Sequence, residues 1–280
     1  MSTQRIHRAT SDDGTEIAGR VHGQGLPLVL VPGAMSDAEF IWGPLLPLLT
    51  EHFECFAMTT RGRGLSGAAT DLAPERQVQD VTAFVDSIGE PVALFGWSQG
   101  GYVALGAAES TSAVSAAAVF EPAVTSVLSE QVAGVLMEKL ATMGELTAAG
   151  QFEDAARTFM GWLANDDELA DAEALDFVAG WAANVAGFLD EVQQSFQSTA
   201  PKATDPSELA KITAPLLLMH GTRSIPLEWW LAGVRHVSEH VRDAHLSEFD
   251  GCGHFAPMSD PAAVAAELVR FFTAVPALRS

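Results

Sequence analysis

A serine flanked by glycines stands between an apolar segment and a segment of helical character. Residues 91–105 read Pro-Val-Ala-Leu-Phe-Gly-Trp-Ser-Gln-Gly-Gly-Tyr-Val-Ala-Leu, in which Gly96, Ser98 and Gly100 form a Gly-x-Ser-x-Gly pattern. The apolar residues before the pattern predict a buried strand, and those after it predict a helix. In that context the serine is predicted to be a nucleophile at the tip of a strained turn, where glycines avoid crowding. The alternative is a glycine-rich turn with an incidental serine.

A serine hydroxyl is a poor nucleophile at neutral pH and needs a general base, which a carboxylate must orient. His254 lies in the glycine-rich stretch Asp250-Gly-Cys-Gly-His254, after the last predicted strand and before the last predicted helix. On open α/β sheets the chain order of such a group is serine, acid, histidine. We therefore predict Ser98 as the nucleophile and His254 as its base. Taken alone, His254 would be read as a surface loop histidine.

Strands and helices alternate along most of the chain, which predicts a mostly parallel sheet of α/β class with helices on both faces. The expected strands are an N-terminal hairpin, Thr3–Thr10 and Glu16–His22, followed by Leu26–Val31, Phe53–Thr59, Val92–Phe95, Val114–Phe120, Pro215–His220 and Ala244–Phe249. A loop is expected over Ala34–Ile41, and the expected helices are Trp42–Glu51, Ala73–Ile88, Leu227–Val237 and Pro261–Ala274.

The alternation stops between Pro122 and Pro206, where the pattern predicts two or three helices and no strand: Ser129–Ala149, Phe152–Ala164 and Ala170–Gln197. Such an insertion either packs as an ordinary helical pair or forms a lid over the site. Its departure from a strand end favours the lid. We therefore divide the chain into a core domain, residues 1–121 and 207–280, and a helical cap, residues 122–206.

Composition narrows the class of protein. The chain has 280 residues and a formal net charge of −21, which should repel nucleic acid and anionic membranes. Its two cysteines, Cys55 and Cys252, form no disulfide framework or CxxC pair, which favours a reducing compartment. Met1–Gly25 has no apolar signal core, and no segment approaches the length of about 18 apolar residues that spans a membrane. We expect a cytoplasmic protein, either a monomer or a homo-oligomer, that acts on a small molecule.

No metal or cofactor site is predicted. His236 and His240 are the histidine pair spaced four residues apart, without acids in a ligand pattern, and a solvated helix face is the favoured interpretation. No Gly-x-Gly-x-x-Gly follows a predicted strand, and no Walker lysine is present.

Four stretches together resemble the α/β-hydrolase fold superfamily over nearly the whole chain: Val31-Pro-Gly33, Thr59-Thr-Arg-Gly-Arg-Gly-Leu-Ser66, Gly96-Trp-Ser-Gln-Gly100 and Gly253-His254-Phe255. The chain is most similar to the cofactor-free esterase, lactonase and haloperoxidase-like group. This resemblance implies an eight-stranded, mostly parallel sheet and a cap that follows the sixth strand.

The resemblance also implies an oxyanion hole made by two backbone N–H groups. One belongs to Gln99, after the nucleophile, and the other to Ala34, with Met35 beside it. The family usually has His-Gly where this chain has Pro32-Gly33, but a backbone donor tolerates that change. Thr59 takes the place of a family aspartate that is mostly structural, so this departure concerns stability.

The third triad member departs from the family pattern, because Ser224 stands where the strand-seven aspartate is usual. A serine is uncharged and cannot stabilise an imidazolium as a carboxylate does. Glu121, which ends the sixth predicted strand, is the preferred substitute, although it could equally mark the start of the cap. Glu228 is the second alternative. The third is that no carboxylate contacts His254 and that Ser224 acts through water.

Aromatic and apolar residues gather in the segments around the predicted site. Those predicted to contact substrate are Met35, Trp42, Trp97, Trp181 and Phe255. An apolar pocket for an acyl or ring-bearing substrate is the functional interpretation, and packing between cap and sheet is the alternative. The predicted activity is hydrolysis of a small to medium apolar ester or lactone through an acyl-enzyme. The alternatives are a perhydrolase or tailoring enzyme (cyclase or lyase) and a non-catalytic ligand-binding protein.

Overall fold

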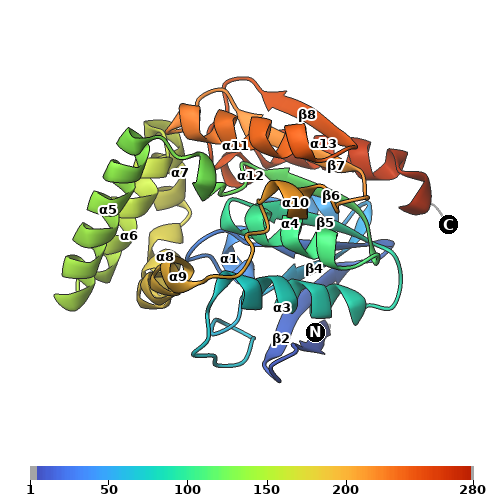
Figure 1. Cartoon of the computed structure of the whole chain (residues 1–280), viewed down its shortest axis with the longest axis horizontal. Helices are drawn as coiled ribbons and strands as arrows, with labels where there is room; N and C mark the ends of the chain where they lie inside the picture. The colour runs from blue at the N-terminus through green and yellow to red at the C-terminus, as the bar shows by residue number, and fades with distance from the viewer. Residues whose placement is uncertain (1–4, 279–280) are drawn as a thin grey trace.

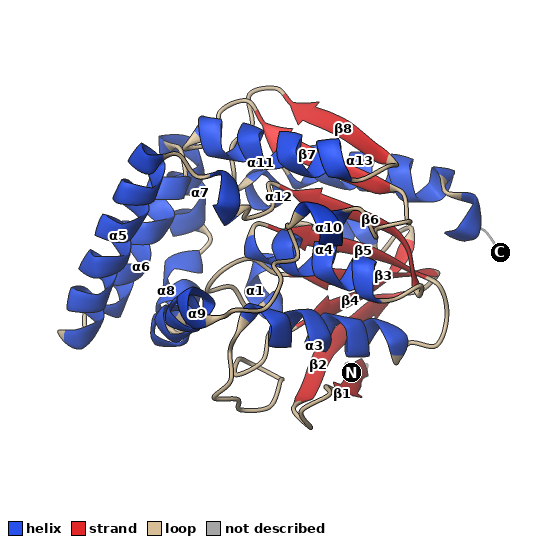
Figure 2. Ribbon diagram, viewed as in Figure 1, coloured by secondary structure: helices blue, strands red, loops and turns tan. Residues whose placement is uncertain are grey.

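Eight strands form one sheet in the order β1-β2-β4-β3-β5-β6-β7-β8 in the computed structural model, which describes residues 5–278 (Figures 1 and 2). The strands are β1 (Arg5–Thr10), β2 (Glu16–Gly23), β3 (Leu26–Val31), β4 (Phe53–Met58), β5 (Val92–Trp97), β6 (Val114–Phe120), β7 (Leu216–Gly221) and β8 (Ala244–Phe249). Pairing is antiparallel from β1 through β2 to β4 and parallel elsewhere. The predicted mostly parallel, eight-stranded sheet is confirmed; Thr3 and Gln4 of the expected hairpin lie outside the described residues.

Alternate residues of the central strands face two separate apolar layers. In β5 every residue is buried, with Leu94 in one cluster and Phe95 in the other. Helices α3 (Pro74–Asp86), α4 (Gln99–Ser110) and α11 (Leu227–His240) cover the Leu94 side, whereas α13 (Pro261–Ala274) covers the Phe95 side. Burial on both faces explains why the central strands read as continuous apolar runs.

The segment after β3 differs from its prediction. Helix α1 (Ala38–Ile41) lies within the expected loop, and only α2 (Leu46–Leu49) forms within the expected helix Trp42–Glu51. Pro47 sits in the first turn of α2 because a proline has no N–H to donate and is tolerated only where a helix begins. The prediction of one long helix here was therefore wrong. Two other short helices, α10 (Pro206–Leu209) and α12 (Ala256–Ser259), precede β7 and α13.

Residues 122–206 contain helices and no strand, as predicted. The α-helices are α5 (Glu130–Ala148), α6 (Phe152–Leu163), α7 (Asp166–Ala174), α8 (Phe177–Ala182) and α9 (Val185–Gln197). The single helix expected over Ala170–Gln197 was wrong, because the chain breaks twice within it. Asp176 adopts a left-handed conformation (φ 58°) before α8, and Asn184 has a non-helical backbone before α9.

This helical segment packs on the sheet's Phe95 side and shares one continuous apolar cluster with it. Figure 1 shows α5 and α6 side by side at one end of the molecule, and α8 and α9 below them near α1. Trp181 of α8 reaches Phe255, with ring centroids 5.5 Å apart. The segment thus covers the loops that follow the carboxyl ends of the strands.

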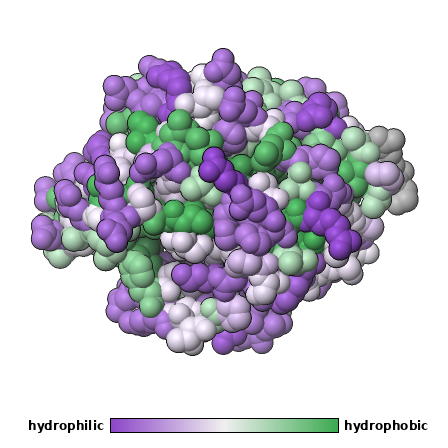
Figure 3. All heavy atoms as spheres, turned by 45° about the horizontal axis from the view of Figure 1, so that its top comes forward, coloured by the Kyte–Doolittle hydropathy of each residue, from purple (hydrophilic) through white to green (hydrophobic). Residues whose placement is uncertain are grey.

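Hydrophilic side chains dominate the face shown in Figure 3, with smaller hydrophobic areas between them. Within residues 5–278, no helix is both long enough and apolar enough to cross a bilayer.

Candidate active site

Ser98 joins β5 to α4 through a strained turn. Its backbone has φ 57° and ψ −120°, and its N–H donates to Phe120 O over 2.9 Å. The flanking glycines are required by close approach, since a Cβ on Gly96 would lie 2.3 Å from Gly100 O and one on Gly100 would lie 2.3 Å from Val31 O. The structure therefore contains the strand, serine and helix arrangement of a nucleophile elbow, with backbone strain at the serine.

His254 and Glu121 lie together although 133 residues separate them. The imidazole Nδ1–H donates to Glu121 Oε2 over 2.7 Å, and both side chains are buried, at 1% and 0% exposure. Glu121 follows β6 with φ 44°, so the chain turns sharply and aims the carboxylate along the sheet edge. Glu228, the second alternative, instead accepts from Ser129 Oγ over 3.3 Å.

Ser224 contacts the carboxylate and not the imidazole. Its Oγ donates to Glu121 Oε1 over 2.5 Å, and Gly221 N–H donates to the same oxygen over 2.9 Å. With the bond from His254, the two carboxylate oxygens accept three hydrogens. Strands β6 and β7 are neighbours in the sheet, which brings their ends to one place. The residue at the family's acid position therefore hydrogen-bonds a carboxylate that the end of the neighbouring strand supplies.

Replacing Ser224 by alanine is expected to lower kcat/KM for an apolar ester about tenfold, because a hydrogen bond to a charged group contributes about 1.5 kcal/mol or more. The carboxylate would lose one of three donors and orient His254 less well. Initial rates with a phenyl ester measure the effect. Ser207→Ala, which removes a surface hydroxyl beside Glu208, is the matched control and should leave the rate unchanged. A Ser224→Ala variant as fast as that control would contradict a role for Ser224 in holding the Glu121 carboxylate.

A column of aromatic rings backs the imidazole. Trp230 stacks on His254 with centroids 4.1 Å apart and planes 11° apart, and Trp229 stacks on Trp230 at 4.2 Å. Trp162 of α6 continues the column at 6.1 Å. On another side, Trp97 Nε1–H donates to the His254 carbonyl over 2.8 Å. Trp230 is not among the residues predicted from sequence to contact substrate; its position six residues after Ser224 was the signal that could have placed it here.

The loop predicted to supply the second oxyanion donor lies against the elbow. A Cβ on Gly33 would be 3.4 Å from Ser98 Cβ, so the residue directly before Ala34 lies against Ser98. Met35 has φ 54° and is buried. The helical segment holds this loop through Asn184 Nδ2–H, which donates to Met35 O over 3.0 Å. The loop around Met35, which has a positive φ, is thus held by a residue of the helical segment.

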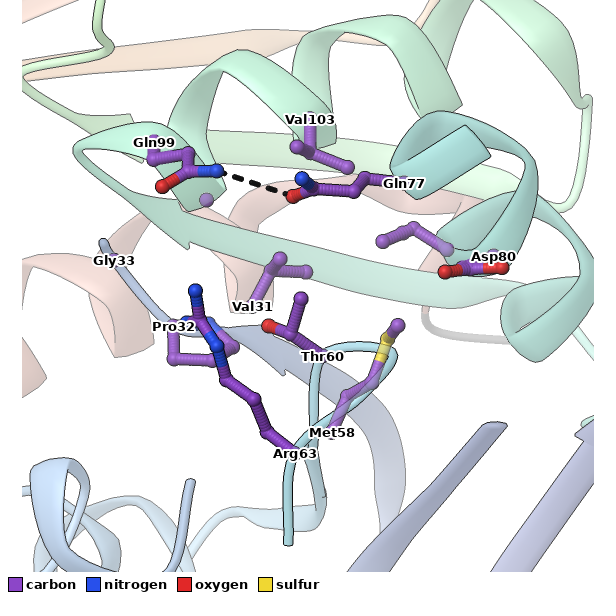
Figure 4. Close-up of a pocket in the computed structure, with 12 residues that line it drawn as sticks. Val31, Pro32, Gly33, Met58, Thr60, Arg63, Gln77, Asp80, Gln99 and Val103 are labelled. Carbon is purple, nitrogen blue, oxygen red and sulfur yellow. Dashed lines mark hydrogen bonds between the residues drawn. The ribbon is translucent and has the colours of Figure 1, made fainter. Parts of the chain in front are cut away.

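Gln99, the other predicted oxyanion residue, has its side chain in a buried polar network. Its Nε2 donates to Gln77 Oε1 over 3.2 Å and to Glu191 Oε2 over 3.0 Å, and Glu191 of α9 forms an ion pair with Arg63. Figure 4 shows Gln99, Gln77 and Arg63 around a cavity of about 10 Å³, which has room for one water and no substrate. Arg63 and Glu191 were missed from sequence because their pairing spans 128 residues.

The residues predicted to contact substrate are all buried, with exposures of 0–2%: Met35, Trp42, Trp97, Trp181 and Phe255. Trp97 and Trp181 both pack on Phe255, whereas Trp42 lies deeper, against Phe95 and Trp97. A surface hollow of about 550 Å³ on α6 and α8 includes none of these five residues. These five side chains are therefore shielded from solvent.

Outside this site, Arg223 pairs with Asp167 at the surface over 2.9 Å. Across the described part of the chain, no group of three or more histidine, cysteine, aspartate or glutamate side chains is arranged to hold a metal ion.

Comparison with known proteins identifies the class. A model of the alpha/beta hydrolase family matches residues 28–267, so the chain belongs to this family. N-formylmaleamate deformylase of Pseudomonas putida is 36% identical over 92 residues, which are 32% of this chain and 34% of that protein. Pimeloyl-[acyl-carrier protein] methyl ester esterase of Legionella pneumophila is 33% identical over 87 residues, 30% of this chain and 32% of that protein. The matched region spans about a third of the length of these curated relatives.

Solved structures match over almost the whole chain. An alpha/beta hydrolase from Sphaerobacter thermophilus has a TM-score of 0.74 at 28% identity, with 95% of this chain and 100% of that one covered. An esterase from Rhodococcus sp. has a TM-score of 0.78 at 23% identity (96% and 99% covered), and the enol-lactonase from Burkholderia xenovorans has 0.75 at 19% (95% and 100%). The last two similarities concern the fold alone. The predicted superfamily resemblance is confirmed.

Proposed function

We propose that this protein is a serine hydrolase that cleaves a small to medium apolar ester or lactone through an acyl-enzyme. The observation that carries the proposal is the hydrogen bond between His254 Nδ1 and Glu121, at the sheet edge where the strained Ser98 turn also lies. A buried carboxylate on Nδ1 leaves Nε2 as the acceptor nitrogen, which is the tautomer a general base needs.

In the proposed mechanism His254 Nε2 takes the proton of Ser98 Oγ as the oxygen attacks the substrate carbonyl. Glu121 stabilises the imidazolium that forms, and the N–H groups of Ala34 and Gln99 hold the developing oxyanion. The imidazolium then protonates the leaving group. Water, activated by the same imidazole, releases the acyl group and restores Ser98.

The substrate class follows from what surrounds the proposed site. Met35, Trp97, Trp181 and Phe255 provide apolar surface, and Trp42 supports Trp97 from below. The nearby arginine Arg63 is already neutralised by Glu191, so an anionic substrate would find no free partner there. An uncharged, largely apolar acyl or ring group fits these surroundings best.

Residues 122–206 act as a cap in this proposal. Because Ser98 and His254 are buried at 8% and 1% exposure, a substrate reaches them only when the helices over the site move. A serine in place of an acid at position 224 is the feature that would favour the non-hydrolytic alternatives. The hydrogen bond between His254 and Glu121 supports hydrolysis instead, which is the function we argue.

Labelling with a fluorophosphonate tests the proposal directly, because this reagent reacts with a serine only when a neighbouring base has activated it. We expect one phosphonyl group per chain, on the peptide that contains Ser98, and parallel loss of p-nitrophenyl ester turnover. An unreactive p-nitrophenyl ether of similar shape should slow the labelling by occupying the site. Absence of both labelling and turnover in folded protein, or labelling of another serine, would overturn it.

A further inference from the structure

A buried carboxylate of the helical segment contacts the loop that carries His254. Glu168, in the first turn of α7, is 3% exposed. Its Oε1 accepts the Phe255 N–H over 2.7 Å. A Cβ on Gly253 would lie 2.3 Å from its Oε2, so the carboxylate also packs closely on that glycine. Glu168 therefore touches the residues on both sides of His254.

The same carboxylate closes the N-terminus of its own helix. Oε2 accepts the Asn165 N–H over 3.2 Å and the Asn165 Nδ2–H over 3.0 Å, while Asn165 Oδ1 accepts the Glu168 N–H over 3.1 Å. This reciprocal capping box fixes the glutamate's rotamer. The end of α7 and the His254 loop are thus joined through one side chain whose every described partner is a donor.

Helix capping alone does not require this burial. Asp166 and Asp167 occupy the same first turn, are exposed, and already supply negative charge to the helix N-terminus. Burial, with a smaller contribution from the charge of Glu121, raises the pKa of Glu168 to about 7, although the backbone hydrogen bonds from Asn165 and Phe255 and the charge of Arg223 act to lower it. A side chain kept in so costly a place has a role beyond the helix end.

Resting on the proposed serine-hydrolase function, we infer that Glu168 is a positioning residue for His254: it anchors the Gly253–Phe255 backbone so that the imidazole keeps its orientation toward Ser98. It touches no substrate in this role. The helices over the site are then part of the catalytic apparatus, since α7 must be docked for the base to be held in place.

A pair of conservative variants separates the effect of the length of the Glu168 side chain from the effect of its charge. Glu168→Asp keeps the charge but is one methylene too short for the Phe255 N–H. Glu168→Gln keeps one acceptor oxygen at full length for that N–H and turns its NH₂ group toward Asn165, so that the helix cap is weakened and the contact with the His254 loop is kept. We expect kcat for a p-nitrophenyl ester to fall at least about tenfold in the aspartate variant, because small misplacement of a catalytic group is costly, and to stay within about threefold in the glutamine variant. KM should change little in either. Asp167→Asn, on the exposed side of the same turn, is the matched control and should resemble wild type.

Hydrogen exchange followed by mass spectrometry gives a readout that needs no activity. Peptides that contain Gly253–Phe255 should exchange faster in the aspartate variant than in the glutamine variant or the control. Wild-type kcat in folded Glu168→Asp would overturn the inference, as would equal losses in both variants with unchanged exchange of this loop. Failure of the proposed function is a separate result, in which the wild-type protein itself shows neither turnover nor labelling.

Discussion

Replacing Ser98 by alanine is expected to lower kcat for an apolar phenyl ester on the order of 10⁶-fold, the size of loss when a triad nucleophile is removed. The reaction would then depend on direct attack by water within the oxyanion hole. The substitution keeps the Cβ, so the positive φ at this position is as strained with alanine as with serine. We therefore expect the melting temperature to change by no more than a few degrees.

Steady-state rates at saturating ester, with thermal melts on the same preparations, measure this prediction. Ser207→Ala again controls for loss of a surface hydroxyl. A Ser98→Ala protein that retains even one part in a hundred of the wild-type rate, after traces of host esterase have been inhibited, would show that the nucleophile lies elsewhere.

Glu121→Gln is expected to reduce kcat about 10⁴-fold, as when the acid of a serine triad becomes an amide. The amide oxygen can still accept from Gly221 and Ser224, which leaves its NH₂ group facing His254 Nδ1. That nitrogen would then have to accept, so the ring proton moves to Nε2. In this tautomer the imidazole cannot take the proton of Ser98.

The matched variant is Glu228→Gln, which neutralises the other candidate acid and should leave kcat within about twofold, since a surface hydrogen bond contributes little. Measuring both variants with one ester decides between the two glutamates. The assignment fails if Glu228→Gln is the inactive protein, or if Glu121→Gln keeps most of the wild-type rate while remaining folded.

Short stretches of sequence predicted much of this fold, because the contacts that form each strand, turn and helix join residues close together in the chain. The strand before Ser98 is a short apolar run, the helix after it follows directly, and the glycines between them relieve contacts within the same turn. The alternation of strands and helices similarly predicts the parallel sheet. His254 could be placed because its loop falls between the last strand and the last long helix.

The sequence favoured Glu121 as the acid but left Glu228 and the absence of any carboxylate open, because the choice depends on where two neighbouring strands end. Register in the sheet pairs Phe120 with Met219. That pairing brings the glutamate after one strand beside the serine turn after the other. The sequence shows the missing acid at Ser224 and offers Glu121 as a candidate, but only the pairing of the two strands shows that this carboxylate reaches Ser224.

Other features escaped prediction because they depend on contacts between distant segments. Glu168 and Glu191 look like ordinary surface glutamates of amphipathic helices, and only the packing of those helices buries them. The breaks near Asp176 and Asn184 interrupt an apolar periodicity that continues through them, so the pattern alone predicted one helix.

The burial of Ser98 and His254 has a consequence for the substrate selectivity of such an enzyme. If the resting shape excludes bulk liquid, only the fraction of molecules that has opened can admit a ligand, and apparent affinity is reduced by that fraction. Once an acyl group is attached to Ser98 and the helices have closed over it again, the access of water to the acyl-enzyme is restricted too. The frequency of opening, more than the strength of any single contact, would then decide which compounds are turned over and how long each acylated state survives.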